Sequence, residues 1–232
     1  MFIRSWLHYK MTLGSSTHQP LDMSSTTASD ASIARVCEAI AADGHAVVRD
    51  FLPAPLVSAL ATEVRRRDAA GDFRAAGVGR EERRIERSDI RGDRILWLDE
   101  HALSSPECAL WAALEALRAA LNRVTFLGLF SFEGHYALYP PGAFYRRHRD
   151  AFLDDDARVL SCVLYLNEAW SVTDGGALRL HLSATESRDV LPVGGTFACF
   201  LAERYEHEVM PATRNRLSIA GWFKRRGGAS SW

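Results

Sequence analysis

The stretch FYRRHRDAF occupies residues 144–152, just past the middle of the chain. It places His148 and Asp150 two residues apart in a run with strand character. Side chains at i and i+2 of a strand lie on the same face of a sheet, so both groups are expected to point the same way. A carboxylate directed into an apolar interior needs a partner, because an unpaired buried charge is costly. A divalent metal ion would be such a partner.

A third ligand is expected from a later strand. His207, in the segment RYEHEVMP, begins that strand 57 residues after Asp150. Two histidines and one carboxylate occupy one face of an octahedral Fe(II) and leave the other positions open for substrates and oxygen. Such a site carries a charge of about +1, so binding an α-keto diacid would leave a negative charge that a nearby cation would stabilise.

Arg216 is the candidate for that cation, nine residues after the second histidine, with Ser218 on the same strand face. Arginine suits a bidentate grip on a carboxylate. Arg214, two residues earlier, is the alternative candidate for this cation. Tyr139 and Tyr165 are candidates for placing phenol groups on the same acid, with packing in the core as the alternative for each.

The sequence around these residues predicts an α+β fold. Residues 31–44, 53–71 and 105–124 carry apolar side chains at helical spacing, with Gly44 expected to end the first helix and Asp30 or Ser32 to cap it. After about residue 126 the chain consists of short segments rich in aliphatic and aromatic residues. These are GLFSFEGHYALYP, RVLSCVLYLN, ALRLHL, DVLPVGGTFACFL, EHEVMP and RLSIAGWF. Helices followed by strands predict helices packed on one sheet of a roll or barrel.

The expected organisation is one domain over residues 30–226, with its catalytic core at about 126–226. Residues 1–29 are polar and typical of a disordered tail, or of a wrongly assigned start if translation begins at Met11 or Met23. Residues 227–232 form a second tail. Residues 74–92 form a long loop in which arginines alternate with acidic residues, and such loops are often functional.

Several functional classes are disfavoured. A net charge of −1 gives no overall attraction to nucleic acid or to an anionic membrane. No apolar run is long enough to span a bilayer, and the N-terminus is a poor signal peptide. Four cysteines without a CxxC motif fit a reducing compartment, so a cytoplasmic location is expected. The acidic run at 154–156 lacks the spacing of a calcium loop, and no HExxH motif suggests a zinc hydrolase.

A family resemblance runs through the same residues. The series YPPGAFYRRHRDAF, RVLSCVLYLNEAW, GGALRL and HEVMPATRNRLSIAGWF resembles the catalytic domain of the Fe(II)- and 2-oxoglutarate-dependent prolyl 4-hydroxylases. It is most similar to the animal oxygen-sensing enzymes and their bacterial relatives. The upstream segment SDIRGDRILWLDE and residues 33–73 resemble the same group, so the similarity covers about residues 31–226.

The resemblance implies a double-stranded β-helix, or jelly roll, with the two histidines and the aspartate on iron. It implies that Arg216 pairs with the distal carboxylate of 2-oxoglutarate, assisted by Tyr165, while Tyr139 lines the cosubstrate pocket. Trp222 and Arg158 match positions near the substrate proline. The spacing before Arg158, across AFLDDDA, is about one residue longer than in the animal enzymes.

The function implied is hydroxylation of a prolyl residue in a protein or peptide, with decarboxylation of 2-oxoglutarate to succinate. Fe(II) is the expected metal, 2-oxoglutarate and O2 the cosubstrates, and ascorbate a supporting reductant. Asp150 favours hydroxylation over halogenation, because a small residue stands at this position in the related halogenases. Two alternatives stay open: hydroxylation of a free amino acid or small metabolite, and a sensor that binds metal and 2-oxoglutarate without turnover. The oligomeric state is not predicted.

Overall fold

The computed structural model describes residues 28–78, 85–87, 89–151 and 157–226. The predicted tails at 1–29 and 227–232 lie outside these residues, except for the last two positions of the first tail. The acidic run at 154–156 also lies outside them.

Three α-helices lie in the N-terminal half of the chain. They are α1 (Asp30–Asp43), α2 (Ala54–Ala69) and α3 (Ser105–Thr125). The hydroxyl of Ser29 caps α1 by accepting a hydrogen bond from the backbone N–H of Ser32 at 3.2 Å. The expected cap at Asp30 or Ser32 is therefore wrong, because Ser29 already holds the N-cap position. Gly44 ends α1 as predicted, with a φ of 74° that glycine adopts without steric cost.

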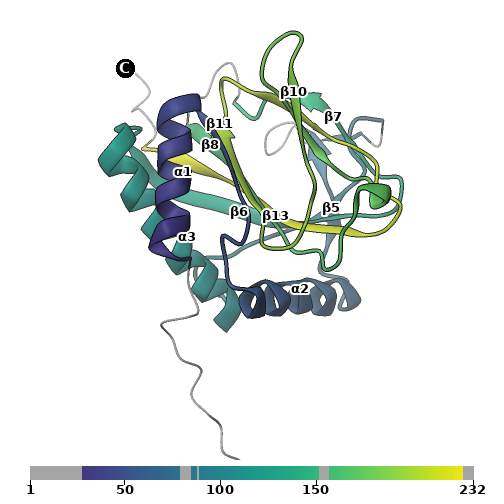
Figure 1. Cartoon of the computed structure of the whole chain (residues 1–232). Helices are drawn as coiled ribbons and strands as arrows, with labels where there is room; N and C mark the ends of the chain where they lie inside the picture. The colour runs from purple at the N-terminus through teal and green to yellow at the C-terminus, as the bar shows by residue number, and fades with distance from the viewer. Residues whose placement is uncertain (1–27, 79–84, 88, 152–156, 227–232) are drawn as a thin grey trace, which may run out of the picture.

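The strands form two main antiparallel sheets and one small ribbon (Figure 1). The seven-stranded sheet has the order β1 (His45–Val48), β11 (Phe197–Leu201), β8 (Arg158–Tyr165), β13 (Arg216–Arg225), β6 (Leu129–Tyr139), β5 (Arg94–Trp97) and β2 (Arg74–Ala75). The four-stranded sheet has the order β10 (Ser187–Val190), β9 (Leu178–His181), β12 (Glu206–Val209) and β7 (Tyr145–His148). The ribbon pairs β3 (Gly77–Val78) with β4 (Ile85–Glu86).

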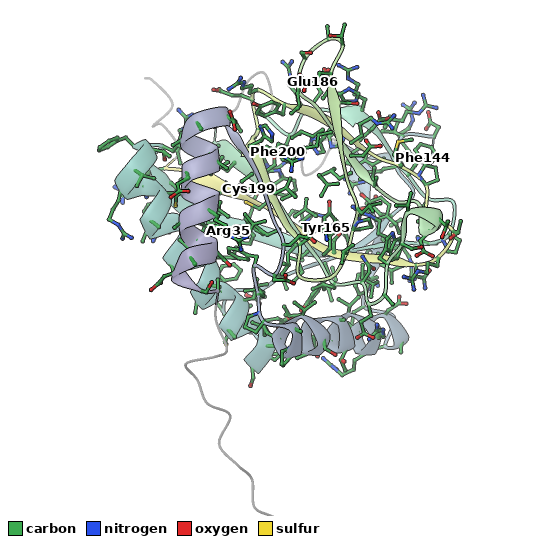
Figure 2. The ribbon with its side chains drawn as sticks, in the orientation of Figure 1. Arg35, Phe144, Tyr165, Glu186, Cys199 and Phe200 are labelled. Atoms are coloured by element: carbon green, nitrogen blue, oxygen red, sulfur yellow. The ribbon has the colours of Figure 1, made fainter. Side chains whose placement is uncertain are left out.

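Side chains that point alternately to the two faces of the seven-stranded sheet contribute to two separate hydrophobic cores. On β8, Cys162 and Leu164 face the helices and join the larger core with residues of α1, α2 and α3. Tyr165 faces the other way and joins a second core that lies between the two sheets. Figure 2 shows the same separation on β11, where Cys199 lies towards α1 and Phe200 towards the interior of the roll. The helices thus cover the outer face of the seven-stranded sheet, as predicted.

Two segments differ in detail from the sequence prediction. The segment DVLPVGGTFACFL contributes to two strands, β10 and β11, because Pro192 and a turn at Gly195, with φ 81°, interrupt it. The loop at 74–92 contains the two-residue strands β2, β3 and β4. Its end returns to the roll, where Arg91 forms an isolated bridge with Tyr145.

Candidate active site

The inner face of the seven-stranded sheet arranges the site in rows across the strands. Arg216 on β13 lies opposite Tyr139 on β6, and the next inward row joins Ser218 to Tyr165 on β8. Two rows further along, Trp222 lies opposite Ser161 on β8. Strand register alone therefore places the arginine at one end of the face and the tryptophan at the other.

The predicted metal ligands converge on the four-stranded sheet and the bend that follows β7. His148 on β7 and His207 on β12 are direct register partners, and their ring centroids lie 4.2 Å apart. The Nε2 atom of His148 lies 3.4 Å from Oδ1 of Asp150, and Nε2 of His207 lies 3.6 Å from Oδ2. The three ligand atoms lie within 4.8 Å of one another. Two imidazole nitrogens and one carboxylate oxygen are the donor set that suits Fe(II).

The structure corrects the sequence argument about Asp150. β7 ends at His148, and Asp150 lies two residues beyond it in a bend. The carboxylate therefore reaches the histidines from a turn, and the i, i+2 argument for a strand does not apply. The expected convergence of the three groups is nevertheless observed.

The protonation states of Asp150 and His207 suit metal binding. Burial disfavours the charged form of Asp150, but His207, His148 and the Ser161 hydroxyl outweigh it and hold the pKa of this carboxyl well below its usual range. Burial lowers the pKa of His207 to about 4, so its imidazole is neutral at pH 7. A neutral imidazole and an ionised carboxylate are the forms that ligate metals.

Arg216 is a buried cation at the deep end of the site. Arg216 is only 1% exposed to solvent. Its Nε–H donates a hydrogen bond to the carbonyl oxygen of Gly176 at 2.9 Å. Nη1 lies 3.4 Å from Oγ of Ser218, and the guanidinium carbon lies 5.0 Å from the ring centroids of both Tyr139 and Tyr165. No carboxylate pairs with it among the residues that the structure describes. A buried guanidinium in this state is suited to an anionic ligand.

The alternative arginine lies elsewhere. Arg214 has a side chain that is 43% exposed, and it lies 3.3 Å from the carboxylate of Asp174. Its guanidinium also donates to the carbonyl oxygens of Glu168 and Ala169. Arg216 rather than Arg214 therefore faces the interior.

A cavity of about 880 Å³ joins these groups. Its lining includes the three ligand residues, Arg216, Ser218 and Tyr139. Tyr165 does not line it but packs behind, against Arg216, and its buried hydroxyl has no hydrogen-bond partner among the described residues. Burial raises the pKa of Tyr165 to about 12, so the hydroxyl stays protonated and able to donate.

Comparison with known proteins agrees with this geometry. The sequence pattern of the 2OG-Fe(II) oxygenase superfamily matches residues 134–224. A crystal structure of a Pseudomonas putida prolyl-4-hydroxylase is 49% identical, with a TM-score of 0.76, and the match covers 84% of this chain and 100% of that one. This chain belongs to the 2OG-Fe(II) oxygenases, among the prolyl hydroxylases. Enzymes of this family use Fe(II), 2-oxoglutarate and O2, and the jelly-roll fold predicted from the sequence is confirmed.

Two further relatives of this oxygenase are informative. The human Egl nine homolog 1 is 30% identical over 192 residues, which cover 78% of this chain and 43% of that protein. The chain therefore spans less than half the length of this relative. A Trichoplax adhaerens prolyl hydroxylase, in complex with a peptide fragment of the hypoxia inducible factor oxygen degradation domain, is 25% identical with a TM-score of 0.73. That match covers 83% of this chain and 88% of that one.

The mouth of the oxygenase cavity combines aromatic and charged side chains. The guanidinium carbon of Arg158 lies 3.6 Å from the ring centroid of Trp222. Glu133 lies 3.2 Å from Nη2 of Arg158 and 3.0 Å from Nζ of Lys224. Trp97, which is 45% exposed, lies 6.3 Å from Trp222 between ring centroids. The two substrate positions suggested by the resemblance thus lie together at the entrance.

Three features of the site are difficult to find from the sequence. His135 lines the cavity, and its Nδ1 is buried without a partner in the described part of the chain. Arg91 also lines it and forms a bidentate ion pair with the fully buried carboxylate of Asp93 at 2.6 and 2.7 Å. Ser161 contacts the metal-ligand carboxylate. Arg91 and Asp93 lie in the segment SDIRGDRILWLDE and Ser161 lies in RVLSCVLYLNEAW, so for these residues the sequence signal was the family resemblance.

Proposed function

We propose that this oxygenase hydroxylates a prolyl residue of a protein or peptide and converts 2-oxoglutarate to succinate and CO2. The observation that carries the proposal is the order of groups along one cavity. A buried Arg216 that has no carboxylate partner among the described residues lies at its deep end, the three potential metal ligands lie beside it, and an aromatic entrance lies opposite. The 49% identity to a prolyl-4-hydroxylase over its whole length supports the same reaction.

His148, Asp150 and His207 would hold Fe(II). The metal, when bound, supplies the activation of O2 and the oxidation of an unactivated C–H bond. The protein's own contribution is to present two imidazoles and one ionised carboxylate on one side, and to leave the cavity side free. Asp150 as a ligand favours transfer of a hydroxyl group to the substrate.

Arg216 would pair with the distal carboxylate of 2-oxoglutarate. Its guanidinium has N–H donors left after the bond to Gly176, and a carboxylate would satisfy two of them in parallel. The rings of Tyr165 and Tyr139 and the hydroxyl of Ser218 lie around the guanidinium, and the three hydroxyls would add hydrogen bonds. Because Arg216 is buried, these bonds would be stronger than in solution.

The entrance would receive the prolyl residue. The indole of Trp222 offers a flat apolar surface to a pyrrolidine ring. The guanidinium of Arg158 also stacks on this indole. The Trichoplax enzyme supports a peptide substrate, because it was observed with a peptide. We also propose a cytoplasmic location, which the four free cysteines support. No helix in the described residues is long and apolar enough to cross a membrane.

The test is oxygen labelling of a host proteome. Purified enzyme is added with Fe(II), 2-oxoglutarate and ¹⁸O2 to a lysate from cells that lack it, and peptides are searched for one added heavy oxygen. The expected result is labelling of one or a few prolyl residues that requires 2-oxoglutarate. The His207→Ala variant should give no label. The matched control is His181→Ala, which removes a partly buried histidine paired with Glu208 outside the cavity lining.

Each alternative has its own result. Turnover of 2-oxoglutarate by a small-metabolite extract, without labelled protein, would show that a free metabolite is the substrate. Metal and 2-oxoglutarate binding without turnover in either extract would show a sensor. Both results would contradict the proposed reaction.

A further inference from the structure

The three potential metal ligands are not held in the same way. His148 and His207 lie in paired strands, so the sheet fixes both backbones and directs both rings. Asp150 lies beyond the end of β7, outside the strand ladder. Its carboxylate therefore needs another contact to fix its direction. In a carboxylate ligand this matters, because rotation about the side chain changes which oxygen faces the metal.

Ser161 supplies that contact. Its hydroxyl donates to Oδ2 of Asp150 at 2.6 Å, a short charge-assisted hydrogen bond. Ser161 is 2% exposed and lies on β8, the third strand of the seven-stranded sheet. Its register neighbours are Phe200 on β11 and Trp222 on β13. The hydroxyl is therefore carried by a rigid, well-packed strand and connects the ligand in the turn to the centre of the sheet.

We propose that Ser161 is a positioning residue that makes Asp150 a ligand through one oxygen only. This inference rests on the metal site of the proposed function. The hydroxyl occupies a lone pair of Oδ2, and Oδ1 then remains as the ligand oxygen. Two histidines and one oxygen leave three of six octahedral positions free, enough for a two-point α-keto acid and O2. A carboxylate bound through both oxygens would take one of these positions.

The experiment measures binding of Mn²⁺, which needs no turnover and no substrate protein. Isothermal titration of the metal-free full-length chain gives the Mn²⁺ dissociation constant of wild type, Ser161→Ala and Ser161→Thr. Loss of a hydrogen-bond partner of a metal ligand typically weakens metal binding about 10- to 100-fold, and this is expected for Ser161→Ala. Ser161→Thr keeps the hydroxyl on a residue that suits a strand and should stay within about threefold of wild type.

A second readout separates positioning from simple affinity. At saturating Mn²⁺, Ser161→Ala should also bind 2-oxoglutarate more weakly, about threefold or more, because the released Oδ2 competes for a position that the α-keto acid needs. In an Asp150→Ala background, adding Ser161→Ala should change Mn²⁺ affinity less than twofold, because the group on which it acts is gone.

Several results would overturn the inference. These are Mn²⁺ binding by Ser161→Ala within twofold of wild type, an equal loss in Ser161→Thr, or a full additional loss in the Asp150→Ala background. If Ser161→Ala does not fold, Ser161→Cys replaces it, since a thiol fills the space but is a weak donor and should show the same loss. Wild type that binds Mn²⁺ but labels no proline refutes only the proposed reaction. Wild type that binds no Mn²⁺ refutes the metal site and this inference together.

Discussion

Replacing Arg216 by lysine is the most informative single change in the cosubstrate site. Lysine keeps the positive charge but loses the planar fork. In the structure one guanidinium N–H is already used by the carbonyl of Gly176, and Nη1 lies near Ser218. An ammonium group cannot keep the bond to Gly176 and also offer two parallel donors to a carboxylate. At least one charge-assisted hydrogen bond to 2-oxoglutarate should therefore be lost.

The expected magnitude follows from that count. A hydrogen bond to a charged group contributes about 1.5–3 kcal/mol, which corresponds to roughly 10- to 100-fold weaker binding of 2-oxoglutarate. At a concentration 100 times the wild-type dissociation constant, the ligand stabilises wild type by about 2.7 kcal/mol. A variant that binds 100-fold more weakly gains only about 0.4 kcal/mol at the same concentration. For a chain of this size the shifts in Tm are roughly 5–10 °C and about 1 °C.

The assay is thermal unfolding with Mn²⁺, with and without 2-oxoglutarate, together with titration of both 2-oxoglutarate and pyruvate. Pyruvate has the same keto acid end but no distal carboxylate, so it should bind wild type more weakly than 2-oxoglutarate does. Its dissociation constant should change little in Arg216→Lys. The matched control is Arg214→Lys, two residues away on the surface, which should keep the full shift. Equal binding of 2-oxoglutarate by Arg216→Lys and wild type would falsify the assigned role.

Three further predictions concern neighbouring groups. Tyr165→Phe removes a hydroxyl without a partner in the described structure, so the free energy of unfolding of the metal-free protein should stay within about 1 kcal/mol of wild type. The variant should bind 2-oxoglutarate several-fold more weakly. An unchanged dissociation constant for 2-oxoglutarate would contradict this. Trp222→Ala should raise the KM for a substrate peptide at least tenfold with the dissociation constant of 2-oxoglutarate unchanged, and an effect on 2-oxoglutarate alone would refute the substrate role. Burial lowers the pKa of His135 to about 4, below its unfolded value of about 6.5, so the unfolded state binds the extra proton between these pH values. This group should therefore lower the free energy of unfolding by about 1.4 kcal/mol per pH unit as pH decreases through that window. Chemical denaturation of His135→Met should show a shallower dependence of stability on pH. An equally steep dependence would contradict the burial of a neutral imidazole.

The sequence predicted the candidate site residues because each belongs to a local pattern. The pair His148 and Asp150, the later histidine, and Arg216 nine residues after it are all visible as residue types at given separations. The alternation of side chains along a strand predicted that Arg216 and Ser218 share a face, and both line the cavity. Even so, the argument that placed Asp150 on a strand was wrong, because a one-dimensional pattern does not show where a strand ends.

The contacts of Ser161 and His135 were outside the reach of such patterns. Ser161 lies 11 residues from the carboxylate it contacts and has the same alternation as any inward-facing strand residue. His135 enters the cavity because Trp97 and Trp222 flank it from neighbouring strands. The same fold could bury a histidine elsewhere as an ordinary core residue, and only the position of its neighbours distinguishes the two cases.

By itself, the sequence determined the α+β class and the order of helices and strands, and it predicted the candidate metal-ligand and cosubstrate residues. These depend on side-chain periodicity and on residue chemistry, which are local properties of the chain. Tertiary structure decided which of Arg214 and Arg216 faces the interior, how Asp150 is held, and that the aromatic entrance and buried guanidinium share one cavity. Those features depend on strand register and on contacts between segments far apart in the sequence, which folding alone brings together.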